Sequence, residues 1–435
     1  MTELFIIAPA RPPRWVARLV AALEACGVEC EVVQGLGGAL ERWHLEIGGE
    51  RGGMPAFSEA VEGRQSVEVR LCARDGDGSR ELRAGCFPYA SRHARTLERI
   101  ADICAGWIRQ ELRACSGSPI ALVLCNRAPR LSLFERVRFL VHETVRLTGH
   151  ALRHAFEETR WDVALTRSSL EGFLGDPAGA WLYWVARNRR EFLADPFFFP
   201  HDGGPQLLCE TQHGRRTSLV SIDINERFGE RRPLLVGDAS SYPYVVDVDG
   251  EPWLVPEHHQ RERVRAYHLN GSVSLAASWS LDGVAVVDPT IVKHGDRWWL
   301  FCTDQESGPN YALRVYWSHD PRGPWHGHAR NPVKIDITGA RPAGNFFMRD
   351  GILHRPAQDC TGRYGRAISI QRIDVLTPER FHETCVARID AASVGRADAV
   401  GVHTLSHGFG WVAIDAQFAR WSPRKPLRLL LERLT

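Results

Sequence analysis

The 435-residue sequence lacks the features that mark disulfide-stabilised, zinc-binding or nucleic-acid-binding proteins. Its 11 cysteines occur singly, in odd number and with no CxxC pair, so they indicate neither a disulfide framework nor a zinc site. We expect reduced and mostly buried thiols. The 54 basic and 52 acidic residues leave a formal charge of only +2. Nothing in this balance indicates nucleic acid as a partner.

Export and membrane signals are also missing. The first residues, MTELFIIAPARPPRW, include a strand-like run but lack the basic start, long apolar stretch and small-residue cleavage site of a signal peptide. No uninterrupted apolar run approaches the ~20 residues that a membrane-spanning helix needs. No glycine-rich phosphate loop follows the first strand-like run, so no cofactor is firmly predicted. We therefore expect a cytoplasmic protein without a transmembrane segment.

The chain before residue 159 has the pattern of an α/β domain. Residues 3–34 have the pattern of strand, helix and strand, and strand-like runs return at residues 66–73 and 81–89. A helical pattern of about 25 residues follows from Ser91. A second long helical pattern ends near Glu158, and we expect it to link this domain, residues 1–158, to the rest of the chain.

Residues 159–435 change to short β-type runs separated by Gly and Asp turns, and five units recur as strand, Gly-containing turn and strand. The units begin with ADPFFF, SYPYVV, VDPTIV, RPAGNF and VHTLSH. Their leading polar or aromatic residues, at intervals of 47, 46, 53 and 62 positions, are Asp195, Tyr242, Asp288, Arg341 and His403. A repeat of this length holds four short strands, which is the period of a β-propeller blade. The sequence therefore predicts an all-β five-bladed β-propeller.

Closure of the propeller brings distant residues together. We expect residues 161–167, WDVALTR, to supply the strand that completes the last blade and hides the sheet edges. Because the innermost strand of each blade begins beside the central channel, the five leading residues should converge on one funnel. The second strand of each unit also ends in an acid: Glu210, Glu257, Asp304, Asp359 and Asp415. For Glu210 and Glu257, a position at the funnel mouth and a solvated strand end are equally expected. Asp304 and Asp415 are expected to be solvated strand ends.

Carboxylates that meet in a pocket suit glycosidic chemistry, in which one group transfers a proton and another acts as base or stabilises positive charge. A lone Asp-Pro is more often a turn, but recurrence at the blade period favours a chemical role for Asp195 and Asp288. Arg341 and Arg355 either hold a phosphate or carboxylate in forked contacts or pair with acids such as Asp288 and Asp359. The candidate substrate-binding residues are Glu210, Tyr242, Arg341, Arg355, Gln358, Asp359 and His403. A structural hydrogen bond is the alternative for His403, and no metal ligands are predicted.

The acidic triplet DVD at residues 247–249 resembles the metal-nucleotide motif of sugar transferases. It falls, however, in a predicted hairpin turn, where aspartate is common. We therefore expect a turn at this position rather than a nucleotide site.

The series ADPFFF, SYPYV, VDPTI, GDRWWLF, RPAG and RPAQDC, within residues 181–420, resembles a known family. It is similar to the five-bladed propeller domain at the N-terminus of plant glucosamine inositolphosphorylceramide transferase and of its bacterial relatives. That domain is in turn similar to the propellers of glycoside hydrolase family forty-three, which use an Asp base, an Asp that tunes pKa and positions substrate, and a Glu acid. The resemblance implies that Asp195 is the base and Asp288 the tuning aspartate. No glutamate matches the acid clearly; Glu257 is the first candidate and Glu210 the second.

A second resemblance concerns the first domain. The segments ERGGMPAFSEAVEG, VEVRL and ELRAGCFPYASRHARTLERI resemble the formyltransferase-like domains that bacterial relatives carry ahead of such a propeller. Formyl transfer in that family needs an Asn, His and Asp trio, which the segment RWHLEIGGE before Arg51 does not present. The resemblance implies a degenerate, noncatalytic domain with His44 as the only remnant.

These observations favour a carbohydrate-active enzyme, and specifically a glycosyltransferase that assembles a bacterial surface glycan or glycolipid from a nucleotide-sugar donor. Glycan-degrading enzymes are generally exported, so the expected cytoplasmic location argues against degradation. Two alternatives stay open. One is a glycoside hydrolase that uses an Asp base and a Glu or Asp acid, and the other is a noncatalytic glycan-binding protein.

Overall fold

The chain divides into two compact units, Met1–Ala155 and Phe156–Thr435. The predicted boundary lies three residues further on, between residues 158 and 159. The computed structural model describes residues 4–8, 12–34, 41–49, 54–75, 78–115, 119–124, 131–188, 191–201, 204–213, 216–224, 230–234, 240–258, 263–269 and 273–426.

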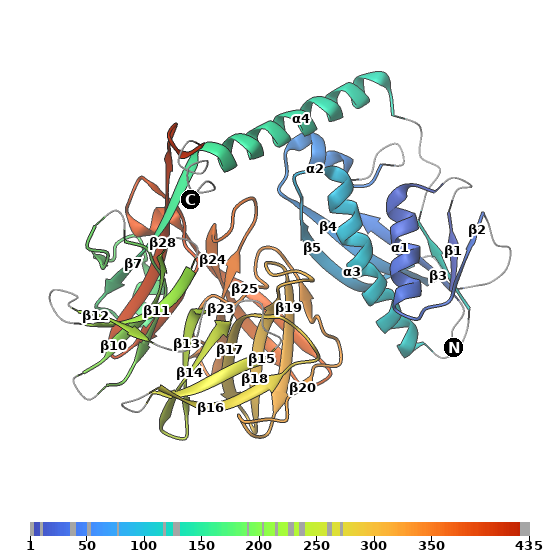
Figure 1. The fold of residues 1–435 in the computed structure, drawn as a ribbon. Coiled ribbons are helices and arrows are strands. Elements are labelled where there is room, and N and C mark those ends of the chain that lie inside the picture. Colours follow the sequence, from blue (N-terminus) through green and yellow to red (C-terminus); the bar gives the residue numbers. More distant parts are fainter. Residues whose placement is uncertain are drawn as a thin grey trace. The chain divides into compact units, whose positions relative to one another are not determined.

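The first unit contains a mixed sheet (Figure 1). Its described strands are β1 (Leu4–Ile7), β2 (Cys30–Val33), β3 (Glu41–Ile47), β4 (Ser66–Asp75), β5 (Gly78–Pro88) and β6 (Ile120–Val123). Their spatial order is β2, β1, β6, β3, β4, β5. The first four of these are parallel to one another, and β4 and β5 extend the sheet as antiparallel strands.

Helices bury the apolar side of this sheet. Helices α1 (Arg14–Ala25) and α3 (His93–Ala114) contact its strands, and α2 (Phe57–Glu62) and α4 (Leu133–Phe156) are the other described helices; no residue of α4 is buried. Side chains alternate along β3, so Trp43 and Leu45 are buried while His44 and Glu46 point to the other face. Among the residues that the structure describes, no helix is long and apolar enough to cross a membrane.

The second unit forms five antiparallel sheets over its described residues, which confirms the predicted five-bladed propeller (Figure 1). The first blade holds β9 (Leu193–Phe199), β10 (Gln206–His213), β11 (Arg216–Asp223) and β12 (Arg231–Leu234). The second holds β13 (Ser240–Val248), β14 (Glu251–His258), β15 (Arg263–Leu269) and β16 (Val273–Ser280). The third holds β17 (Val286–His294), β18 (Arg297–Asp304), β19 (Ala312–Ser318), β20 (His326–Gly327) and β21 (Lys334–Ile335). The fourth holds β22 (Phe347–Arg349), β23 (Ile352–Asp359), β24 (Ala367–Leu376) and β25 (Phe381–Asp390).

The fifth blade joins the two ends of the unit. It contains β26 (Ala399–Gly401), β27 (Leu405–Gly408) and β28 (Trp411–Trp421), together with β7 (Glu157–Thr166) and β8 (Tyr183–Trp184). Strand β7 pairs with β28 along its whole length, from Glu157 opposite Trp421 to Thr166 opposite Val412. This pairing confirms the prediction that residues 161–167 complete the last blade. Two short helical segments, α5 (Leu170–Gly175) and the 3-10 turn η1 (Ala391–Val394), lie in the connections.

The Asp-Pro and Tyr-Pro steps at the heads of the first three blades are β-bulges. The pairing register of the two inner strands shifts at each step. Asp195, Tyr242 and Asp288 have φ angles of 50°, 46° and 50°, in the left-handed region that side chains larger than glycine seldom adopt. All three side chains are buried. The bulge, a strained local geometry, therefore fixes each head residue inside the propeller.

Aromatic packing between blades holds these heads in place. Phe197 of the first blade lies edge-to-face with Tyr242 and Tyr244 of the second, at ring-centroid distances of 5.0 and 5.5 Å. The blades cannot shift without breaking such contacts, so the positions of the head residues are set by the packed core.

Candidate functional site

Asp288, at the head of the third blade, is held by side chains from the second and fourth blades. Arg341 donates from Nε to Oδ2 of Asp288 at 2.6 Å and from Nη2 to Oδ1 at 3.3 Å, a forked guanidinium–carboxylate contact. Gln358 of β23 donates from Nε2 to the same Oδ2 at 3.2 Å. The backbone N–H of Asp288 donates to Oε2 of Glu257, on β14, at 3.1 Å. The carboxylate is thus fixed in orientation and almost removed from water.

Asp195 lies beside a buried histidine. Nδ1 of His403 is 2.6 Å from Oδ2 of Asp415, and its Nε2 is 3.6 Å from Oδ1 of Asp195. The hydroxyl of Thr404 donates to the same Asp195 oxygen at 2.5 Å. The ring of His403 stacks on Trp161 of the closing strand β7, with centroids 3.9 Å apart. Closure of the propeller therefore positions His403 against Asp195.

The same contact between blades occurs at both aspartates. Asp415 of the fifth blade accepts the backbone N–H of Asp195 at the head of the first blade, at 2.9 Å. Glu257 of the second blade accepts the backbone N–H of Asp288 at the head of the third. In each case an acid on the second strand of one blade anchors the strained head of the next blade.

Four carboxyl groups, those of Asp195, Glu210, Glu257 and Asp288, interact in this buried space, and Asp415 adds a fifth beside Asp195. Burial raises the pKa of Glu210 well above its usual range, and the neighbouring carboxylates raise it further; Glu210 also hydrogen-bonds Asp195. Burial likewise raises the pKa of Asp195, against the effect of His403, and the pKa of Asp288, against the effect of Arg341. Because close carboxylates cannot all ionise in a buried site, the cluster keeps a proton that isolated acids would lose.

Two cations balance part of this charge. Burial disfavours the charged imidazole of His403, but Asp415 and Asp195 outweigh burial and raise its pKa. The guanidinium of Arg341 is paired with Asp288. Asp195, His403 and Asp415 also form a group whose ligand atoms lie within 4.8 Å of one another, close enough for a metal ion.

Tyr242, a predicted substrate-binding residue, links blades instead. Its hydroxyl accepts the backbone N–H of Gly344 at 2.9 Å and hydrogen-bonds the hydroxyl of Thr290 at 3.0 Å. The side chain is fully buried. These contacts give Tyr242 a structural role at the junction of the second, third and fourth blades.

Arg355 and Asp359, two of the predicted substrate-binding residues, pair with side chains on the face of β23 opposite Gln358. Side chains alternate along β23, so Gln358 points toward Asp288 while Arg355 and Asp359 lie on the opposite face. Arg355 makes a forked contact with Glu383 at 2.7 and 2.6 Å. Asp359 pairs with Arg388. The sequence left ligand binding or pairing with an acid open for Arg341 and Arg355. Both pair with an acid: Arg341 with Asp288, as expected, and Arg355 with Glu383.

The expectation that Asp304 and Asp415 are solvated strand ends is wrong, because both are buried. Asp304 accepts the hydroxyl of Ser307 at 2.6 Å and lies 3.6 Å from Arg314. It misses the cluster because Thr303, not Asp304, stands opposite Val287 in the pairing register. In the other two blades the residues at that position are glutamates, Glu210 opposite Ala194 and Glu257 opposite Ser241.

Sequence reasoning missed two contacts of Arg341. Its guanidinium lies 4.9 Å from the centroid of the Tyr364 ring, and its Nη1 donates to Oδ1 of Asn310 at 3.1 Å. Both residues lie in connections outside the strand repeat. The one available signal was the position of Tyr364 in GRYG, just after the RPAQDC run. In the DVD triplet, Asp247 accepts the backbone N–H of Gly250 at 3.0 Å, which is the expected turn.

Comparison with known proteins places these residues in a family. Residues 186–407, just over half of the chain, match the family described as glucosamine inositolphosphorylceramide transferase 1, N-terminal. The chain belongs to this family. The matched segment includes every candidate residue from Asp195 to His403 and ends before Asp415.

Individual relatives cover a limited part of their own length. The protein named glucosamine inositolphosphorylceramide transferase 1 from Oryza sativa subsp. japonica is 33% identical over 253 residues, which are 51% of this chain and 32% of that protein. The protein of the same name from Arabidopsis thaliana is 32% identical over 229 residues, 48% of this chain and 29% of that protein. The chain therefore spans about a third of the length of the curated relatives it matches.

Similar solved structures are more distant in sequence. The catalytic domain of a GH62 α-L-arabinofuranosidase from Coprinopsis cinerea is 14% identical, with a TM-score of 0.37 over 53% of this chain and 93% of that chain. A GH43 β-1,3-galactosidase with galactodeoxynojirimycin is 10% identical, with a TM-score of 0.35 over 47% of this chain and 81% of that chain.

Proposed function

We propose that the second unit is the carbohydrate-active domain of a glycosyltransferase that acts on a glycan or glycolipid, with the reaction at the cluster around Asp195 and Asp288. Family membership supports this proposal. The name of these relatives includes glucosamine and inositolphosphorylceramide, so a phosphate-bearing sphingolipid is the first acceptor to test. The observation that carries the proposal is the burial of four interacting carboxyl groups beside two cations.

The paired carboxyl groups of Asp195 and Glu210 are suited to proton transfer. They hydrogen-bond each other, and burial raises the pKa of both. A pair of this kind shares one proton, so one member can accept a proton from an attacking hydroxyl while the other donates to a leaving group. In this proposal Asp195 is the base and Glu210 the acid. Glu257, the first candidate from sequence, instead holds the backbone of Asp288.

Asp288 and Arg341 have a supporting role in this proposal. The Asp288 carboxylate interacts with both Asp195 and Glu257, and its forked contact with Arg341 fixes its orientation. Arg341 is already paired with Asp288, so the proposal does not require Arg341 to bind a phosphate group of the substrate. It depends on the carboxyl groups. A nucleotide-sugar donor is proposed from family membership alone.

The proposal is tested by incubating the purified chain with a panel of nucleotide sugars and with inositolphosphorylceramide or simple sugar acceptors, scoring released nucleotide. Asp288→Asn is the test variant. Asp304→Asn is the matched control, because Asp304 is also buried and ion-paired but lies outside the cluster. Release from one donor that Asp288→Asn abolishes and Asp304→Asn retains supports sugar transfer.

Other outcomes separate the rival functions. Hydrolysis of aryl glycosides without nucleotide release would replace the transferase with a glycoside hydrolase that uses the same acids. No turnover of either kind, together with glycan binding that survives Asp288→Asn, would show a noncatalytic glycan-binding domain.

For the first unit we propose a degenerate relationship to formyltransferase-like domains. For the whole protein we propose a bacterial source and a cytoplasmic location. The segment at residues 50–63 and the lack of the Asn, His and Asp trio in RWHLEIGGE support the first part. Turnover of a formyl donor by the purified chain would contradict the noncatalytic part of this proposal.

A further inference from the structure

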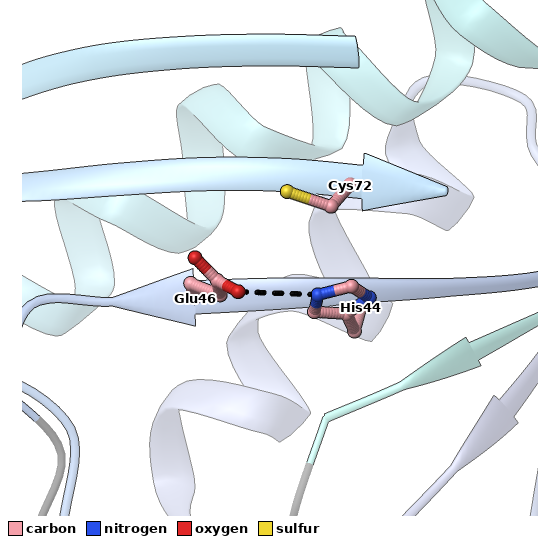
Figure 2. Close-up of side chains that lie close together, drawn as sticks. All are labelled: His44, Glu46 and Cys72. Carbon is pink, nitrogen blue, oxygen red and sulfur yellow. Dashed lines mark hydrogen bonds and ion pairs between the residues drawn. The ribbon is translucent and has the colours of Figure 1, made fainter. Parts of the chain in front are cut away.

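Three side chains of the first unit, from two neighbouring strands, lie together on one face of its sheet (Figure 2). His44 and Glu46 project from β3, and Cys72 projects from the neighbouring strand β4. The antiparallel register places His44 directly opposite Cys72. Since alternate residues of a strand share a face, His44 and Glu46 lie on the side away from buried Trp43 and Leu45.

The distances within this group suit a single metal ion. Nε2 of His44 and Oε1 of Glu46 are 3.2 Å apart. Two ligands that each bind a tetrahedral ion at ~2.0 Å stand ~3.3 Å from one another. One ligand atom from each of His44, Glu46 and Cys72 lies within 4.8 Å of the other two. A Zn–S bond is ~2.3 Å long, so binding requires Sγ of Cys72 to approach the ion through a change in its side-chain rotamer.

The donor set selects the class of ion. Thiolate and imidazole ligands favour Zn²⁺ and similar transition metals, whereas Ca²⁺ and Mg²⁺ require oxygen ligands. Three protein ligands leave a fourth position for water or another small ligand, as in catalytic zinc sites. The side chains of His44 and Glu46 are 29% and 52% exposed, so an ion can enter from solvent.

Space for a further ligand adjoins the group. A cavity of about 320 Å³ has Glu46 in its wall, and Ser66, Glu68 and Arg70 of β4 also line it. A molecule in this cavity would lie next to one of the three ligands. The cavity is polar on the side that the strands contribute.

We propose that His44, Glu46 and Cys72 bind one Zn²⁺ ion whose fourth position is open to water or a small polar ligand beside this cavity. The site is separate from the carboxyl cluster of the propeller and does not depend on the proposed sugar transfer. It would give the first unit a binding function of its own.

Co²⁺ is the spectroscopic probe for the test. The full chain is stripped with a chelator, titrated with Co²⁺ and then with Zn²⁺. The wild-type protein should bind Co²⁺ at this site with a thiolate-to-cobalt charge-transfer band in the near ultraviolet and tetrahedral visible absorption, both lost when Zn²⁺ displaces Co²⁺. Cys72→Ser should remove the charge-transfer band. His44→Gln and Glu46→Gln should weaken Zn²⁺ binding by about tenfold or more, since changes behind a ligand already cost 10- to 100-fold.

Cys86→Ser is the matched control, because Cys86 lies on β5 of the same sheet but outside the group; it should keep the band. Cobalt bound by Asp195, His403 and Asp415 would give no such band, because that group has no thiol. A wild-type protein without the band, or a band that survives Cys72→Ser, would overturn the proposal. If Cys72→Ser misfolds, His44→Gln decides, because the His44 side chain is partly exposed: unchanged Zn²⁺ affinity in a variant with unchanged circular dichroism would overturn the proposal as well.

Discussion

Replacing Glu383 with glutamine should destabilise the propeller by about 3 kcal/mol, because it leaves the Arg355 guanidinium buried without its counter-charge. Arg355 donates from Nε and Nη2 to both oxygens of Glu383, and Lys334 Nζ lies 2.9 Å from one of them. The side chains of Arg355 and Glu383 are only 2% and 1% exposed, so water cannot replace the lost charge. Breaking a buried pair from one side costs ~3–5 kcal/mol, and the acceptor oxygen that glutamine retains favours the lower end.

Urea unfolding, followed by tryptophan fluorescence and circular dichroism, measures this loss. With a slope of ~3 kcal/mol per molar, a loss of ~3 kcal/mol lowers the transition midpoint by ~1 M urea. Asp398→Asn is the control, because its ion pair with Arg396 is 53% exposed on the aspartate side and should contribute less than ~1 kcal/mol. Equal midpoints for wild type and Glu383→Gln would refute the structural role of the pair and would return Arg355 to the list of ligand-binding candidates.

The pH dependence of the same difference has a defined sign. Burial alone would raise the pKa of Glu383, but Arg355 and Lys334 outweigh burial and lower the pKa in the folded state. When the pKa of a carboxyl group is lower in the folded state than in the unfolded state, its ionised form stabilises the fold at pH values above the unfolded-state pKa. This stabilisation is lost as the pH falls through the folded-state pKa. The midpoint difference between wild type and Glu383→Gln should therefore shrink in acid.

Three further predictions concern the carboxyl cluster and its frame. Asp288→Asn should lower kcat/KM for sugar transfer by about 10²- to 10⁴-fold, measured by nucleotide release, and should also lower Tm in calorimetry because it leaves the buried Arg341 without its counter-charge. His403→Gln removes the cation that lowers the pKa of Asp195, so the acidic limb of the pH profile of kcat/KM should move to higher pH; a shift to lower pH would contradict the proposed base. Tyr242→Phe leaves the buried backbone N–H of Gly344 without its acceptor and should cost about 1–3 kcal/mol in urea unfolding, with an unchanged pH profile.

The architecture of the second unit could be predicted from the sequence because its signals are local. Alternating apolar runs, Gly-containing turns and a blade-length interval recur along the chain, and each depends only on residues close in sequence. The strand at residues 161–167 could be assigned to the last blade because an open ring would expose sheet edges. The two Asp-Pro steps are also local signals, and they identified Asp195 and Asp288 as candidates before the structure showed that both are buried.

Strand register decides which residues other than Asp195 and Asp288 belong to the carboxyl cluster, and the sequence does not determine this register. A slip of one residue moves a side chain to the other face of a sheet, and this separates Asp304 from its neighbour Thr303 and Arg355 from Gln358. The predicted strand ends did not show which of these side chains faces the carboxyl cluster.

Sequence by itself therefore determined the blades, their number and the strained aspartates at their heads, because strand period and turn chemistry are written in short segments. Only the tertiary structure decided which carboxyl groups lie together, that Asp415 lies against His403, and that His44 stands opposite Cys72 on the neighbouring strand. These contacts join residues distant in the chain, and closure of the propeller and the pairing of β3 with β4 bring them within reach.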